Sequence, residues 1–113
     1  MLFRSRWDVI VFHPPIDNGS VFAMRIVGLP AEHVTITDAG IAINGSPITP
    51  PPTLAHIRYV PREQTDSSAT PAGEVTVPPD SFFVLGDNSL HANDSRFWGS
   101  VPRRDIVGKV LNK

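Results

Sequence analysis

Prolines and glycines are spread along the whole of this chain, twelve and eight among 113 residues, and they exclude a fold built from long helices. A proline inside a helix removes a backbone hydrogen bond and clashes with the preceding turn, and a glycine lowers helix stability. Between them lie short apolar runs, at residues 8–12, 22–28 and 82–85, of a length that suits strands. We therefore expect an all-β fold, either a small antiparallel sandwich or a partly closed barrel.

The clearest strand pattern covers residues 34–43. Valine and isoleucine alternate with threonine over residues 34–37, and two isoleucines alternate with other residues over 41–43. The intervening Asp-Ala-Gly at 38–40 predicts a hairpin turn, and Asn44-Gly45 predicts a second turn. A hairpin therefore forms the middle of the expected sheet structure.

The pattern is weaker over residues 46–73, which we interpret as a loose, loop-rich insertion within one domain covering residues 1–113. Three consecutive prolines at 50–52 cannot occupy a central strand. A short strand is predicted at 55–60, followed by an exposed polar loop. Further strands are predicted at 74–77 and at 106–111, with an irregular polar loop at 87–98.

Composition excludes several classes of function. The formal net charge of −1 does not suggest a nucleic-acid partner, and the absence of cysteine excludes disulfides, thiolate metal sites and cysteine nucleophiles. No histidines or carboxylates show the spacing of metal ligands, so we expect no metal and no cofactor. The densest apolar run, residues 9–12, is far too short to span a membrane, so the chain itself is expected to be soluble.

Three segments, taken in order, carry a family resemblance. Residues 6–12 read Arg-Trp-Asp-Val-Ile-Val-Phe, and residues 24–30 read Met-Arg-Ile-Val-Gly-Leu-Pro. The third contains Gly-Asp-Asn at 86–88 and Asp-Ser-Arg at 94–96. They resemble the Arg-Gly-Asp-Val-Val-Val-Phe strand, the Lys-Arg-Val-Val-Gly-Leu-Pro segment and the Gly-Asp-Asn box of bacterial signal peptidase I. That family consists of membrane-bound serine endopeptidases that remove signal peptides from exported proteins.

The resemblance implies a serine nucleophile and a neutral, buried lysine that accepts its proton. A lysine acts as a base only when desolvation lowers its pKa. Here Met24 stands at the lysine position, and Ala92 stands where the family has a serine that hydrogen-bonds the lysine. The family's Ser-Met-x-Pro-Thr segment, which carries the nucleophile, does not occur in these residues. No catalytic residue of the family is therefore intact in this sequence.

Two groups of residues match the family outside the catalytic pair. One is the strand beside which the family binds its extended substrate: Val21, Phe22, Ala23 and Met24. Strand pairing needs no particular side chain, so peptide binding can outlast catalysis; equally, these residues could serve only as core and edge. The other group is a scaffold expected to hold the site loop, in part through an Asp-Arg pair: Gly86, Asp87, Asn88, Asp94, Ser95 and Arg96.

Three hypotheses about function follow. The first is a signal-peptidase-like domain that is catalytically inactive. The second is the C-terminal part of an active peptidase, with the nucleophile on a missing segment and an unorthodox base such as His91. The third is a scaffold module that binds signal-peptide-like extended peptides without cutting them.

Partners and location follow from the resemblance as well. Family members have a strand before the segment at 6–12; without it an exposed edge could recruit a partner strand or a second copy of the chain. The family suggests the outer face of a membrane. Trp7, Phe97 and Trp98 could contact such a surface, although aromatic side chains more often belong to the core.

Overall fold

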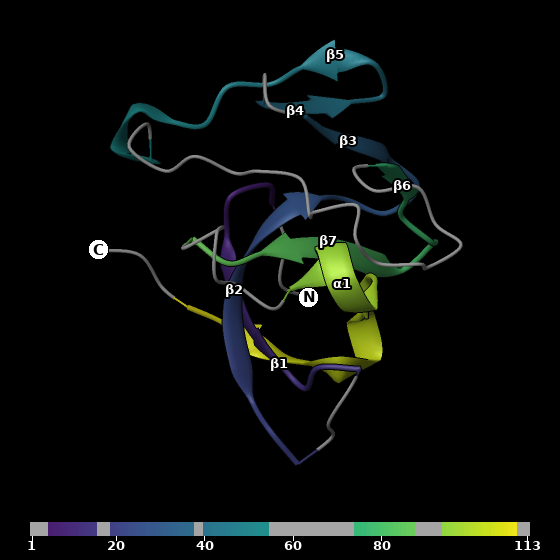
Figure 1. Cartoon of the computed structure of the whole chain (residues 1–113). Helices are drawn as coiled ribbons and strands as arrows, with labels where there is room; N and C mark the ends of the chain where they lie inside the picture. Colours follow the sequence, from purple (N-terminus) through teal and green to yellow (C-terminus); the bar gives the residue numbers. More distant parts are fainter. Residues whose placement is uncertain (1–4, 16–18, 38–39, 55–73, 88–93, 111–113) are drawn as a thin grey trace.

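The chain folds into two antiparallel sheets, and the predicted all-β class is confirmed (Figure 1). The computed structural model describes residues 5–15, 19–37, 40–54, 74–87 and 94–110. The strands in chain order are β1 (Val9–Phe12), β2 (Phe22–Gly28), β3 (His33–Thr37), β4 (Gly40–Ile43), β5 (Ser46–Pro47), β6 (Glu74–Thr76), β7 (Ser81–Leu85), β8 (Val101–Pro102) and β9 (Ile106–Lys109). The first sheet has the order β8-β7-β2-β1-β9, and the second has the order β5-β4-β3-β6.

Strand β7 of the first sheet is buried on both faces. All five residues of β7 are buried, because neighbouring side chains point into two different apolar clusters. Phe83 and Leu85 belong to one cluster, and Phe82 and Val84 belong to the other. This explains why β7 reads as a continuous apolar run, whereas β3 alternates between buried and partly exposed residues.

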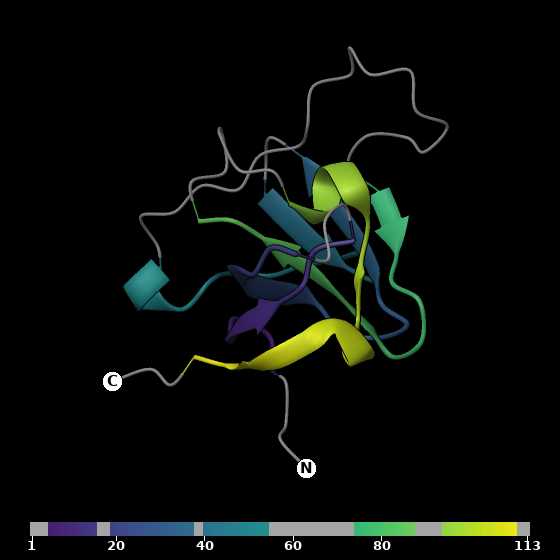
Figure 2. The ribbon, with the colours of Figure 1, turned by 90° about the horizontal axis from the view of Figure 1, so that it is seen from below.

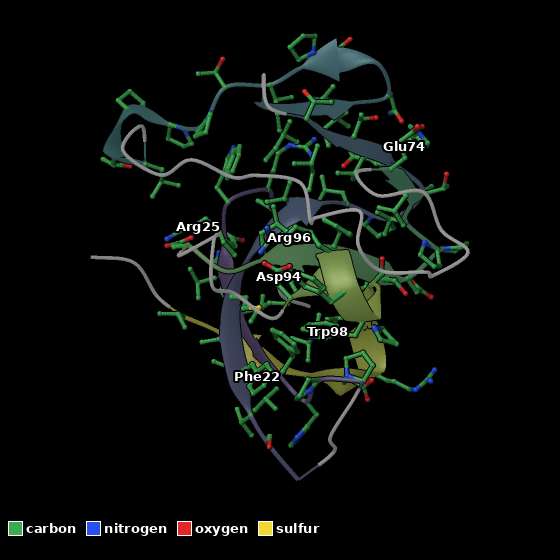
Figure 3. The ribbon with its side chains drawn as sticks, viewed as in Figure 1. Phe22, Arg25, Glu74, Asp94, Arg96 and Trp98 are labelled. Carbon is green, nitrogen blue, oxygen red and sulfur yellow. The ribbon has the colours of Figure 1, made fainter. Side chains whose placement is uncertain are left out.

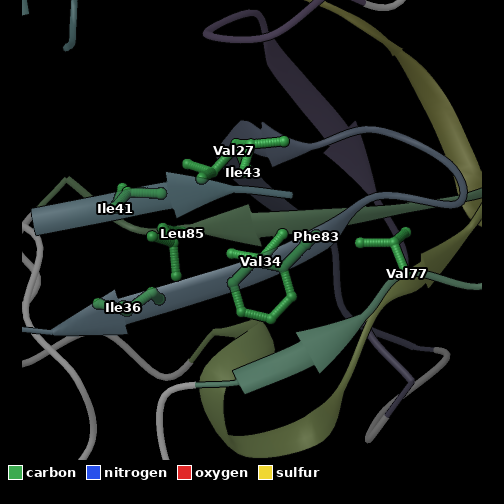
Figure 4. Packing of buried hydrophobic residues seen from close by; sticks show 8 residues of the cluster. All are labelled: Val27, Val34, Ile36, Ile41, Ile43, Val77, Phe83 and Leu85. Atoms are coloured by element: carbon green, nitrogen blue, oxygen red, sulfur yellow. The ribbon is translucent and has the colours of Figure 1, made fainter. Parts of the chain in front are cut away.

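The first cluster fills the space between the two sheets (Figure 4). Each sheet contributes side chains to it, and one more comes from the residue after β6: Val27, Val34, Ile36, Ile41, Ile43, Val77, Phe83 and Leu85. We call this set the inter-sheet cluster. It is the contact through which the hairpin of β3 and β4 packs on the first sheet.

The second cluster lies on the opposite face of the first sheet, and we call it the lower cluster. It is formed by Ile10, Phe12, Ile26, Phe82, Val84 and Val101. Trp98, at the end of the short helix α1 (Ser95–Trp98), packs against it, and its ring centroid is 5.9 Å from that of Phe12. Strand β9 lies beside β1 at the edge of this sheet (Figure 2).

Most of the expected strands are present. The observed bounds of β1, β2, β3 and β4 agree with the predicted runs to within a residue or two, and Asn44-Gly45 forms the turn between β4 and β5. The prediction that residues 87–98 form an irregular loop is wrong in its last part, because α1 begins at Ser95. The predicted strand at 55–60, the polar loop after it and the turn residues 38–39 lie outside the described residues.

Candidate functional site

Strand β2 presents Met24 to the apolar side of the first sheet. Phe22 and Met24 alternate with Ala23 along the strand, and both pack against the lower cluster while Ala23 is exposed. Figure 3 shows Phe22 on β2 and Trp98 on α1, two side chains that pack against this cluster. Met24, which the resemblance places at the family's lysine position, is therefore partly buried among hydrocarbon and aromatic groups.

The edge of β2 that faces β7 is paired over only part of its length. The pairs with β7 run from Arg25, opposite Leu85, to Gly28. Residues 22–24 pair with β1 on their other side. Because β7 ends at Leu85, no strand in the described part of the chain pairs with 22–24 on the β7 side. The main-chain groups of such an edge can bind an extended peptide by strand addition.

Arg25 connects this part of β2 to the segment that follows β7. Its Nε and one terminal nitrogen donate to the two carboxylate oxygens of Asp87, at 3.0 and 2.8 Å. The other terminal nitrogen donates to the main-chain oxygen of Trp7, at 2.9 Å. Only 14% of the Arg25 side chain is exposed. A bidentate pair of this kind fixes both the distance and the orientation of its partners.

Asp94 anchors the other end of the same segment. Its side chain is completely buried, and both of its oxygens accept hydrogen bonds from the Arg96 guanidinium, at 2.8 and 3.0 Å. It also accepts from the Gly86 amide, at 2.9 Å, and from the Arg96 amide, at 3.1 Å. A buried carboxylate is tolerated only with partners of this kind. Asp94 therefore ties the start of α1 to the end of β7 (Figure 3).

Two further residues of α1, Ser95 and Phe97, differ in their surroundings. The Ser95 hydroxyl accepts a hydrogen bond from the Val84 amide of β7, at 2.9 Å, and is buried. The Arg96 guanidinium lies 5.4 Å from the ring centroid of Phe97, which is 52% exposed. The hydroxyl thus satisfies a main-chain amide of β7, which fits a scaffold role for Ser95.

The structure places several of the sequence-predicted residues together. Phe22, Ala23 and Met24 lie on β2, next to the pair that Arg25 forms with Asp87. Val21, just before β2, is 55% exposed. Asn88, Ala92 and His91 lie outside the described residues, so the structure does not bear on their predicted roles.

The aromatic residues divide between core and surface. Trp7 packs against the inter-sheet cluster and Trp98 against the lower cluster, whereas Phe97 remains half exposed. Within the described residues, no group of three or more histidine and acidic side chains could hold a metal ion. No helix in this part of the chain is long and apolar enough to cross a membrane.

Comparisons with known proteins agree with this geometry. The family model described as signal peptidase, peptidase S26, matches residues 4–112. The chain belongs to the signal peptidase S26 family. It is 40% identical to a signal peptidase I from Leptolyngbya laminosa over 113 residues, covering 94% of this chain and 50% of that protein. It is 33% identical to a signal peptidase I from Bacillus caldolyticus, covering 93% of this chain and 58% of that protein.

A solved structure supports the same assignment. The crystal structure of a signal peptidase I from Enterococcus faecalis V583 matches with a TM-score of 0.75 and 29% sequence identity, covering 98% of this chain and 99% of that one. The chain thus spans 50% and 58% of the Leptolyngbya and Bacillus relatives but nearly all of this solved chain. The expected signal-peptidase-I-like fold is confirmed.

Two contacts of the site were not foreseen from the sequence. Arg25 lies within the Met-Arg-Ile-Val-Gly-Leu-Pro segment, but its partner Asp87 is 62 positions away, and only the pairing of β2 with β7 brings them together. The contact of Arg25 with the Trp7 main chain has no side-chain signal at all. The only sequence sign of the contact was that Arg25 and Asp87 each belong to a segment that resembles the family.

Proposed function

We propose that this signal-peptidase-like domain binds extended, signal-peptide-like segments alongside β2 without cleaving them. The observation that carries the proposal is the position of Met24, partly buried against the lower cluster and next to the open edge of β2. A thioether does not accept a proton at neutral pH and is only a weak hydrogen-bond acceptor. The residue at the family's base position therefore cannot activate a nucleophile.

A second departure from the family supports the loss of the base. Ala92 stands where the family's serine would hydrogen-bond the lysine. Without a lysine, that hydroxyl has no group to orient, so the two replacements agree with each other. The Asp94–Arg96 and Arg25–Asp87 pairs are nevertheless present, and they fix Asp87 after β7 and Asp94 before α1.

The edge of β2 supports the binding part of the proposal. An added peptide would continue the sheet on the β7 side of residues 22–24. Its alternate side chains would face the side of Phe22 and Met24, which is apolar, and would there meet no charged base. Small apolar side chains of the Ala-x-Ala type suit such a surface.

The test is an NMR titration of the isotope-labelled chain with a peptide ending in Ala-x-Ala, followed by mass spectrometry of the peptide. We expect shifts at residues 21–24 and at Asp87, with the peptide intact. The same peptide with N-methyl groups on alternate residues, which removes main-chain donors and keeps the side chains, should bind far more weakly.

Two exposed valines provide a matched pair of variants. Val21 is 55% exposed beside the proposed edge, and Val107 is 62% exposed on β9, which β1 separates from β2. Val21→Asp should weaken peptide binding, whereas Val107→Asp should leave it unchanged. A well-dispersed spectrum without shifts would contradict binding, and a cleaved peptide would show that another base acts.

A further inference from the structure

The turn that leads into β1 has an unusual residue at its most restricted position. The Ser5 oxygen accepts a hydrogen bond from the Asp8 amide, at 3.1 Å, which closes a four-residue turn. Its third residue, Trp7, has a φ of 77°. A positive φ at this position is typical of a type II turn and favours glycine, because other side chains clash with the backbone there. The matching family segment has glycine at this position, so tryptophan departs from the family segment.

Side-chain and main-chain contacts together hold Trp7 in this conformation. The side chain is partly buried and packs against the inter-sheet cluster, as Ile48 and Val75 also do. The Trp7 amide donates to the Ile26 oxygen of β2, at 2.7 Å. Burial of a large aromatic side chain can offset the unfavourable backbone conformation.

The consequence of this turn is the direction of the Trp7 carbonyl. Its oxygen accepts a hydrogen bond from one terminal nitrogen of Arg25, at 2.9 Å, while Nε and the other terminal nitrogen donate to the two oxygens of Asp87. A guanidinium held by a carbonyl on one side and a carboxylate on another has little freedom to rotate. The backbone at Trp7 therefore helps to fix Asp87, the residue after Gly86, next to the edge of β2.

We propose that Trp7 is a positioning residue for the peptide site, because its packing maintains the left-handed turn whose carbonyl orients Arg25 and, through it, Asp87. The inference rests on the proposed function, since the site that it positions is the peptide-binding edge of β2. Through Trp7, the packing between the two sheets is coupled to the geometry of that edge.

The test compares Trp7→Ala with Trp7→Gly. Both variants remove the indole, so both lose its packing, but glycine readily adopts a positive φ and alanine does not. The Arg25 side-chain NMR signal reports the contact without any peptide, so its outcome does not depend on the proposed function. We expect Trp7→Gly to keep this signal shifted and protected from exchange, and Trp7→Ala to lose both properties. Affinity for the Ala-x-Ala peptide should fall about fivefold more in Trp7→Ala than in Trp7→Gly, the factor given by a backbone preference of about 1 kcal/mol.

Asp87→Asn adds a variant that leaves the inter-sheet cluster untouched, which matters if Trp7→Ala folds poorly. It should weaken peptide binding by a similar factor, and combining it with Trp7→Ala should add little, because both act on one contact. Equal effects of alanine and glycine on the Arg25 signal would overturn the positioning role. So would fully additive losses of affinity in the double variant. If the Arg25 signal behaves as expected but no variant or wild-type chain binds peptide, the proposed function fails and the structural coupling stands.

Discussion

At the level of a single residue, the proposed loss of the catalytic base rests on Met24. Its side chain packs against the lower cluster, in surroundings that disfavour a charged group. The same surroundings are what a lysine needs if it is to be neutral and act as a base. In the proposed function, Met24 therefore keeps the apolar environment of a base without the base itself.

This idea predicts the effect of Met24→Lys on stability. The amine would have to be desolvated or neutralised on folding, so we expect a loss of about 2 kcal/mol near neutral pH. A lowered folded-state pKa means that the unfolded chain binds the extra proton, so the loss should shrink as the pH rises toward the ordinary lysine pKa. Chemical denaturation at several pH values measures it, with Met24→Leu as a near-neutral control. A loss that does not change with pH would show that the position is solvated.

Some single-residue features could be predicted from the sequence and others could not. The Asp-Arg pair of the site loop was foreseen, and the structure shows it as Asp94 with Arg96. These residues are two positions apart, so local sequence contains the pair. The contacts of Arg25 depend on the register between strands, and the positive φ of Trp7 depends on packing that compensates it; neither is visible in local sequence.

At the level of elements, the two sheets pack tightly against each other at Gly28, the last residue of β2. A Cβ atom at this position would lie 2.7 Å from a methyl of Val34 in β3 and 2.9 Å from the Cβ of Phe83 in β7. It would also lie 3.1 Å from a methyl of Val77. The first two distances are too short for carbon atoms and the third is unusually tight, so glycine permits the close packing of β2 and β3 in the inter-sheet cluster.

We expect Gly28→Ala to destabilise the fold by about 1–3 kcal/mol, because the added methyl overpacks a well-filled core. Gly108→Ala is the matched control: it also lies in a strand, and nothing lies within 4 Å of its added methyl. That control should change stability by no more than about 1 kcal/mol, and could even increase it. Equilibrium unfolding of both variants gives the comparison, and similar values for the two would contradict the packing argument.

Strands were easier to predict than the helix. The alternation in β3 and β4 reflects burial on one face, and the apolar run of β7 reflects burial on two faces. The order of apolar and polar residues therefore shows these strands directly. Helix α1 has only four residues and no periodic pattern of its own. It depends on the Asp94 cap and on the packing of Trp98, which are tertiary features.

At the scale of the whole molecule, the order of strands and the contacts between the sheets needed the structure. Within the described residues, β8 and β9 are the outer strands of the first sheet. Association of a partner strand or a second copy with such an edge stays a prediction.

One polar contact joins the segment before β1 to the connection between β2 and β3. The two terminal nitrogens of Arg6 bind both carboxylate oxygens of Glu32, at 2.7 and 2.9 Å.

This contact predicts how the stability of the fold depends on pH. Burial by itself raises the pKa of Glu32, but hydrogen bonds from Arg6 and from the Leu29 amide, together with the positive charge of Arg6, lower it below the ordinary value of 4.5. The unfolded chain therefore binds a proton at higher pH than the folded chain does. The stabilisation is fully present above the ordinary pKa and is lost as the pH falls through the lower, folded-state pKa.

We expect Glu32→Gln to destabilise the protein by about 1–2 kcal/mol near neutral pH, since the charge-assisted pair is lost from a partly exposed position. In acid the wild-type carboxyl is itself protonated, so the difference between variant and wild type should become small. Urea unfolding of both proteins from neutral pH to about pH 2 measures this difference, in which the titration of all other groups cancels. A difference that stays constant over the whole range would mean that Glu32 acts through its shape and not through its charge.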